Sequence, residues 1–121
     1  MTRYEFLMKT YNRYHNNPNG RAINNEGFCV YRAENGNKCA IGWELPDELY
    51  FPEMDKKLQS WDGAEVAELC PNLEPFLLEA NGRGFIYAVQ SFHDCTYNWN
   101  EKGITEEGEK HFYMIVNKYI L

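Results

Sequence analysis

The chain has 121 residues, 44% of them hydrophobic, which is enough to bury one core without disulfides or metal ions. Its net charge of −6 argues against direct binding to nucleic acid, which needs a basic surface. No run approaches the ~18 apolar residues of a membrane helix, and the N-terminus lacks the apolar stretch of a signal peptide. We therefore expect a single soluble domain over residues 1–121 that acts inside a cell and does not contact a membrane.

The negative charge is concentrated in the middle of the chain. Residues 44–79 contain ten acids and two bases, which gives −8, whereas residues 1–43 contain six bases and three acids, which gives +3. An acidic stretch of this kind is typical of a solvated surface, and it also suits a basic partner.

Helical spacing of apolar residues recurs along the chain. The first stretch has Thr2 as N-cap and Glu5 three residues later, which is the pattern of a capping box. Thr105 is expected to cap the last helix, whose first turn is acidic. The predicted helices are 2–17, a short one from about 62 that ends before 71, a turn within 72–82, an amphipathic helix over 83–99, and 105–120.

Residues 28–42 are predicted to form a β-hairpin. The letters "AENGNK" place Gly36 where a three-residue loop needs a left-handed residue after a type I turn. In this register Tyr31 faces Cys39. A two-residue turn at Asn35 and Gly36 is the alternative, and it would shift the register by one residue.

The favoured register also pairs Cys29 with Ile41.

After the hairpin, a strand end at Trp43 is expected to give way to a short helical turn begun by Pro46. The fold predicted from these elements is α+β: a small single domain, mostly helical, with one antiparallel β-hairpin at about 28–42 packed on helices.

The four cysteines are candidate metal ligands. Cys29 and Cys39 on the hairpin, with His93 and Cys95, would offer four soft ligands to zinc. However, the C-x9-C spacing of Cys29 and Cys39 matches no zinc knuckle. His93 and Cys95 are two residues apart on a predicted helix, so their side chains point in different directions. Unpaired cysteines are among the most buried residues, so we interpret these as reduced thiols in the core and predict no metal site and no cofactor.

Side chains near the hairpin and on the 83–99 helix form one candidate site. Gln90, His93 and Tyr97 share one helix edge, and Arg32 and Lys38 make a positive spot that suits either an anion or the acids of residues 44–55. A structural role for His93 is the competing interpretation. The candidate ligand-binding residues are Tyr31, Arg32, Lys38, Gln90, His93 and Asp94.

The acidic stretch forms the second candidate site. It contains aromatic side chains, which serve as anchors in protein interfaces. The candidate partner-binding residues are Trp43, Glu44, Asp47, Glu48, Tyr50, Glu53, Asp55 and Trp61. The sequence contains no motif that assigns catalytic residues, so we expect a binding protein rather than an enzyme.

Several blocks of the sequence resemble a family of small uncharacterised proteins from bacteriophages and prophages. These blocks are "CVYR" at 29–32, "GNKCAIG" at 36–42, "LPDELY" at 45–50, "PEM" at 52–54 and "VQSFHD" at 89–94. The pattern departs from the family at Trp43 and Glu44, where a small or thiol residue and an aliphatic one are usual.

The resemblance implies a phage-type accessory protein in the cytoplasm of a bacterial host cell, and it implies no catalytic residues. Such proteins often act as inhibitors of host components, including defence proteins, without being enzymes. We therefore expect the chain to block or modulate a host protein through its acidic, aromatic surface. The alternative is a pocket between the hairpin and the His93 helix that holds a small ligand or carries out a reaction.

Overall fold

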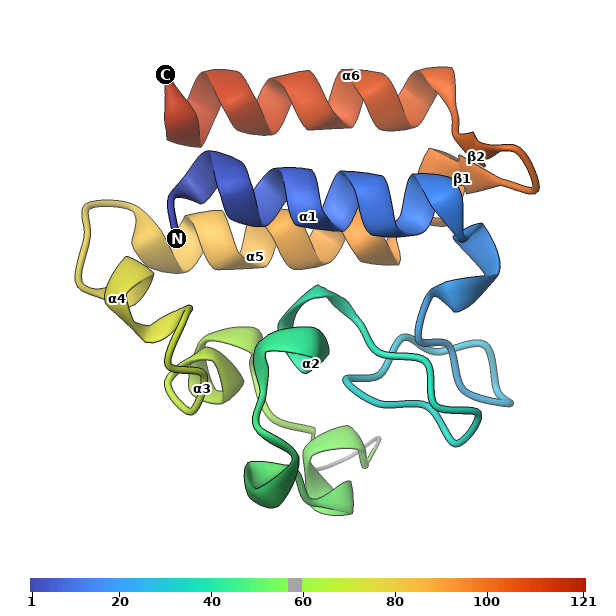
Figure 1. Cartoon of the computed structure of the whole chain (residues 1–121), viewed down its shortest axis with the longest axis vertical. Coiled ribbons are helices and arrows are strands. Elements are labelled where there is room, and N and C mark those ends of the chain that lie inside the picture. The colour runs from blue at the N-terminus through green and yellow to red at the C-terminus, as the bar shows by residue number, and fades with distance from the viewer. Residues whose placement is uncertain (57–59) are drawn as a thin grey trace.

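Three long helices form one side of the molecule in the computed structural model, which describes residues 1–56 and 60–121. They are α1 (Arg3–Asn16), α5 (Gly82–Asp94) and α6 (Glu106–Ile115), and α6 continues into a π-helical turn (Val116–Ile120). The three helices lie side by side and pack against one another (Figure 1).

Shorter elements and irregular segments form the other side (Figure 1). The short α-helices are α2 (Ala40–Glu44), α3 (Gly63–Ala67) and α4 (Glu74–Leu77), with 3-10 turns at Pro18–Gly20, Asp47–Leu49, Pro52–Asp55 and Thr96–Asn98. A two-stranded antiparallel sheet, β1 (Trp99–Asn100) and β2 (Gly103–Ile104), connects α5 to α6 and places Trp99 opposite Ile104.

The predicted α+β class is confirmed, and so are the starts of the first and last helices. The Thr2 hydroxyl accepts the Glu5 N–H at 3.1 Å, and the Glu5 carboxylate accepts the Thr2 N–H at 3.1 Å. Thr105 caps α6 by accepting the Gly108 N–H at 3.0 Å. Local side-chain capping therefore sets these helix starts.

The helix predicted over 83–99 ends earlier, at Asp94. The carbonyl of Phe92, in the last turn of α5, accepts hydrogen bonds from the Asn98 amide at 3.0 Å and the Trp99 indole N–H at 3.1 Å. Because these side chains satisfy a carbonyl that a continuing helix would use, the chain can turn back into β1.

The predicted hairpin at 28–42 is only partly present. Its register is correct: the Cys39 N–H donates to the Tyr31 carbonyl at 3.2 Å, and Gly36 has a φ of 91° in the turn. However, the segment forms a single bridge between Arg32 and Lys38 instead of two strands, and the sheet lies at residues 99–104.

The pairing stops because the chain enters α2 at Ala40, where a second strand was predicted. The Cys39 thiol caps this helix by accepting the Gly42 N–H at 3.3 Å. The predicted pairing of Cys29 with Ile41 is therefore wrong, and Cys29 bridges to Ile23 instead. The strand end expected at Trp43 is also wrong, since that residue belongs to α2; the short turn after Pro46 is confirmed.

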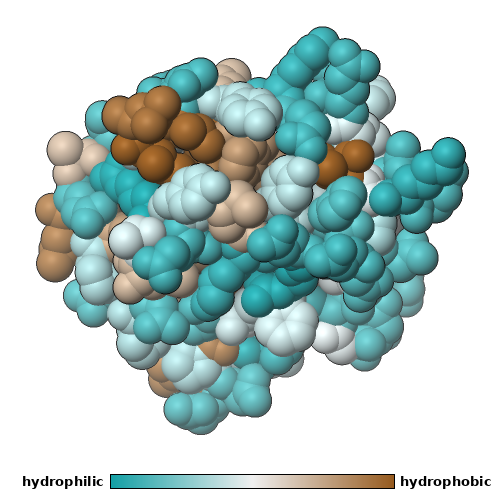
Figure 2. All heavy atoms as spheres, turned by 45° about the horizontal axis from the view of Figure 1, so that its top comes forward, coloured by the Kyte–Doolittle hydropathy of each residue, from teal (hydrophilic) through white to brown (hydrophobic). Residues whose placement is uncertain are grey.

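Aromatic rings fill the core between the helices. Phe76 and Phe85 meet edge to face with ring centroids 5.4 Å apart, and Phe6 lies 6.1 Å from Phe85. Figure 2 shows a face that is mostly hydrophilic, with one larger apolar patch and several smaller, separate ones. Among the described residues, no helix combines the length and the apolar character needed to cross a membrane.

We predict that Gly42→Ala lowers the free energy of unfolding by about 3 kcal/mol, because overpacking a tight site is costly. A Cβ at Gly42 would overlap the carbonyl oxygen of Tyr31. Gly36→Ala is the matched control, since its Cβ meets nothing within 4 Å and only the positive φ opposes it, at about 1 kcal/mol. Urea denaturation measures both, and equal losses would contradict the prediction.

Candidate functional site

A pocket of about 600 Å³ lies where segment 24–31 meets the C-terminal end of α5. It brings together residues from both predicted sets. Tyr31, Gln90 and Asp94 come from the ligand-binding set, whereas Asp55 and Trp61 come from the partner-binding set. Below, this cavity is called the acidic pocket.

Asp55 fixes one wall of the acidic pocket. Its carboxylate accepts the Tyr31 N–H at 2.7 Å, the Arg32 N–H at 3.2 Å and the Tyr50 hydroxyl at 2.8 Å. The Tyr31 hydroxyl donates to the Trp61 carbonyl at 2.6 Å, and burial raises the pKa of Tyr31, so this hydroxyl keeps its proton. Asp55 and Tyr31 therefore hold the wall rigid.

Three polar side chains form a network along α5. Gln90 donates to Asp94 Oδ1 at 3.1 Å, and His93 Nδ1 lies 2.6 Å from the same oxygen. His93 Nε2 accepts the Ala22 N–H at 3.2 Å, so the proton of the neutral ring is on Nδ1, which donates to Asp94. Burial lowers the pKa of His93, although Asp94 opposes this effect. His93 is fully buried, which supports its structural interpretation.

Cys29, His93 and Asp94 place potential metal-ligand atoms within 4.8 Å of one another. Both ring nitrogens of His93 already take part in hydrogen bonds, so a metal would have to displace one of them. Burial, with a smaller effect of Asp94, raises the pKa of the Cys29 thiol to about 11. The Cys29 thiol donates to the Asp94 carbonyl at 3.8 Å, so hydrogen bonds already engage all three side chains of this group.

The two predicted cations contact the acidic stretch. Arg32 pairs with Asp47 at 2.7 Å and donates to the Leu45 carbonyl at 2.6 Å. Lys38 lies 3.9 Å from Asp47 and 4.9 Å from the ring centre of Trp43. Of the two interpretations of this positive spot, the structure shows pairing with nearby acids, and neither cation lines the acidic pocket.

The predicted partner-binding residues divide into two groups. Glu44 has a side chain only 5% exposed and pairs with Lys9 at 3.2 Å, while Trp61 packs edge to face on Phe51 with ring centroids 5.0 Å apart. Tyr50 and Asp55 bond to each other. The members that remain exposed are Trp43, Asp47, Glu48 and Glu53.

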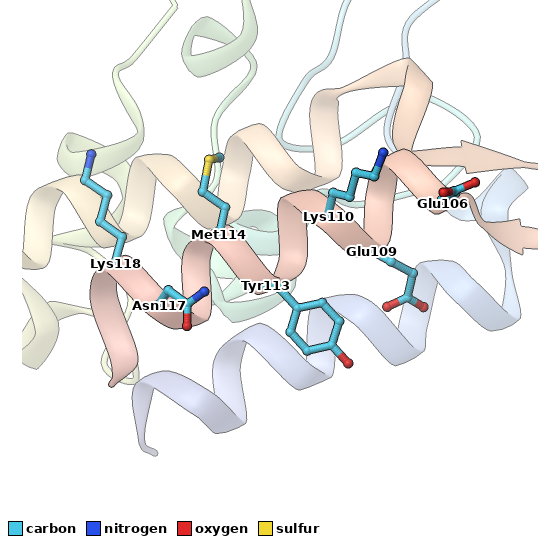
Figure 3. Close-up of a pocket in the computed structure, with 7 residues that line it drawn as sticks. All are labelled: Glu106, Glu109, Lys110, Tyr113, Met114, Asn117 and Lys118. Carbon is cyan, nitrogen blue, oxygen red and sulfur yellow. The ribbon is translucent and has the colours of Figure 1, made fainter.

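A broader hollow lies along α6, and a single helix supplies all of its side chains. Figure 3 shows them spread along that helix rather than converging on one point. Tyr113 and Met114 are 60% and 59% exposed, and Lys110 pairs with Glu107 of the same helix at 3.5 Å. This hollow is an exposed helix face, so the acidic pocket is the better candidate site.

The charged residues that line the acidic pocket, among those described, are all acidic. Three carboxylates, from Glu26, Asp55 and Asp94, line it together with the rings of Phe28 and Trp61. Within residues 1–56 and 60–121, no lysine or arginine lines it. Carboxylates and aromatic faces both attract cations, so the pocket suits a positively charged group.

Glu26 and Phe28 are among the lining residues that were not predicted as site residues from the sequence. They lie in a turn made by Asn24, whose side-chain oxygen accepts the N–H groups of Glu26 and Phe28, both at 2.9 Å. The letters "NNEG" at 24–27 indicate such a turn, but they do not say what the turn faces.

No family model, curated protein or solved structure matches this chain. The resemblance to bacteriophage proteins therefore stays a prediction.

We predict that stability falls as the pH drops below about 6.5, the ordinary pKa of histidine. Burial holds the pKa of His93 below this value in the folded state, so the unfolded chain binds more protons and unfolding is favoured. His93→Gln should lose this part of the pH dependence. At neutral pH it should cost about 2–3 kcal/mol, because Ala22 and Asp94 lose a buried partner.

His111→Gln is the control for this prediction, since burial also lowers the pKa of His111. His111→Gln should remove only the part of the pH dependence of stability that comes from His111. Urea denaturation across the pH range measures both variants, and an unchanged pH dependence in His93→Gln would contradict the assignment.

Proposed function

We propose that this chain is a non-enzymatic binding protein that receives a positively charged group of a protein partner in the acidic pocket. The observation that carries the proposal is the set of three carboxylates and three aromatic residues, with no described lysine or arginine among the residues that line the pocket. A lysine or arginine side chain of a partner fits such a site, since it would meet both a carboxylate and an aromatic face.

The reactive groups around the pocket support binding rather than catalysis. The Cys29 thiol is neutral, because burial raises its pKa to about 11. The His93 ring and the Tyr31 hydroxyl already bond to Asp94 and to the Trp61 carbonyl. The fixed network instead gives a preformed cavity, which reduces the entropy lost on binding.

The exposed members of the acidic stretch would extend this contact. Asp47 and Glu53 are 82% and 54% exposed at their side chains and also pair with Arg32 and Lys56 of the same chain. Charges at the rim of an interface mainly speed association and exclude wrong partners. The sequence resemblance favours a bacterial host protein as the partner, with inhibition of that protein as the result.

A small organic cation is the second candidate ligand of the same pocket. Its volume of about 600 Å³ favours this, since it falls within the range of small-molecule sites, roughly 300–1,000 Å³.

We predict that Glu26→Lys abolishes partner capture from a bacterial lysate. The new lysine would carry the same positive charge as the partner group and would repel it from the pocket. Glu26 is exposed, so the substitution should leave the fold intact. Glu68→Lys is the matched control, since Glu68 is exposed and does not line the pocket. Mass spectrometry should find a protein retained by the wild type and by Glu68→Lys but not by Glu26→Lys.

Equal retention by all three proteins would contradict the proposal. Thermal denaturation with spermidine or argininamide then tests the second candidate. A rise in Tm for the wild type but not for Glu26→Lys would favour a small cation over a protein.

A further inference from the structure

The middle of α6 is apolar on two faces, and only one of these faces packs on the core. Residues 112–116 are all apolar, which is more than one face of a helix can hold. Phe112 and Ile115 are buried, whereas Tyr113 and Met114 are 60% and 59% exposed. The helix therefore presents an exposed apolar surface at its middle.

The charged side chains at the two ends of this exposed face differ in sign. Glu106 and Glu109 lie at the N-terminal end and Lys118 at the C-terminal end, and all three line the same hollow as the exposed apolar pair (Figure 3). Lys110 lies between the two ends and pairs with Glu107 at 3.5 Å. The face is thus acidic at one end, apolar at the middle and basic at the other end.

The outermost two charges, Glu106 and Lys118, are free to meet another molecule. Both residues are exposed, and neither forms an ion pair within residues 1–56 and 60–121. Their positions in the sequence place them about 18 Å apart along the helix axis, so they cannot pair with each other. A second molecule could supply an opposite charge to each.

An antiparallel pair of α6 helices matches both the middle and the ends of this face. A two-fold axis between Tyr113 and Met114 places each of these side chains opposite the other one in the second copy. The same axis places Lys118 of one copy opposite Glu109 of the other and one helical turn from Glu106. A parallel pair would instead bring like charges together. The face is therefore complementary to itself, as the contact of a symmetric dimer has to be.

We propose that this face of α6 binds a second copy of this chain in an antiparallel contact centred on Tyr113 and Met114. The apolar side chains supply the affinity, and the charges set the orientation, since exposed ion pairs add little free energy. A single helix supplies the contact, so the buried area falls near the lower limit of specific interfaces, about 1,200 Å². Dimerisation therefore depends on protein concentration.

This contact is independent of the function proposed above. The residues that line the hollow on α6 and those that line the acidic pocket have no member in common. A dimer built through α6 therefore leaves the acidic pocket of each copy open.

Sedimentation equilibrium of the whole chain, from about 10 μM to about 1 mM, tests the proposal over the range expected of a weak contact. The average mass should rise with concentration from 14.3 kDa towards twice that value. An average mass that stays at 14.3 kDa throughout would overturn the proposal.

Lys118→Glu should remain monomeric at every concentration, because it places a further acid against Glu106 and Glu109 of the second copy. Lys102→Glu is the matched control, since Lys102 is exposed, lies between β1 and β2, and undergoes the same change of charge. The control should dimerise as the wild type does. Dimerisation of Lys118→Glu, or its loss in Lys102→Glu, would overturn the proposed contact.

A mixture of two variants tests the antiparallel arrangement. Glu106→Lys should also weaken dimerisation, because Lys118 of the second copy then meets a like charge. Both positions are exposed, so both variants should fold. An equimolar mixture of Lys118→Glu and Glu106→Lys should regain mass, since the new glutamate of one protein faces the new lysine of the other. A mixture whose average mass equals that of the separate variants would contradict this arrangement.

Discussion

The hydrogen bond between the Ala22 N–H and Nε2 of His93 joins the two sides of the molecule. It ties the irregular segment after α1 to the last turn of α5. The same ring packs edge to face on Tyr14 of α1, with centroids 4.7 Å apart. The His93 carbonyl also accepts the Trp99 indole N–H at 3.2 Å, so β1 depends on the same turn.

The acidic pocket depends on this junction. On one side, His93 holds Asp94, which lines the acidic pocket. On the other side, the bond to Ala22 fixes the backbone next to the buried Arg21. Arg21 and burial both oppose a positive charge on the His93 ring, so protonation of this ring would favour solvation of the junction.

Local signals explain what could be predicted from the sequence. The Thr2 and Thr105 caps and the apolar stripes fix the helices, because both depend on residues within one or two turns. The turn at Gly36 fixed the register of Tyr31 and Cys39 for the same reason. Of the predicted ligand-binding residues, Tyr31, Gln90 and Asp94 line one pocket, whereas Arg32 and Lys38 lie outside it.

The remaining features depend on tertiary packing. The entry into α2 requires the contact of Gly42 with the Tyr31 carbonyl, and strands as short as β1 and β2 carry almost no apolar pattern. The burial of Arg21 has no local signal, because arginine is usually exposed. Asp55 was predicted as a partner contact, but its position beneath the N–H groups of Tyr31 and Arg32 brings it into the pocket.

The junction requires a neutral His93 ring with its proton on Nδ1. NMR of the imidazole nitrogens tests it most directly. We predict a protonated Nδ1 and an unprotonated Nε2, unchanged from about pH 8 down to about pH 6, where an ordinary histidine is already largely protonated. A proton on Nε2, or a titration of the ring near the ordinary histidine pKa, would contradict the account.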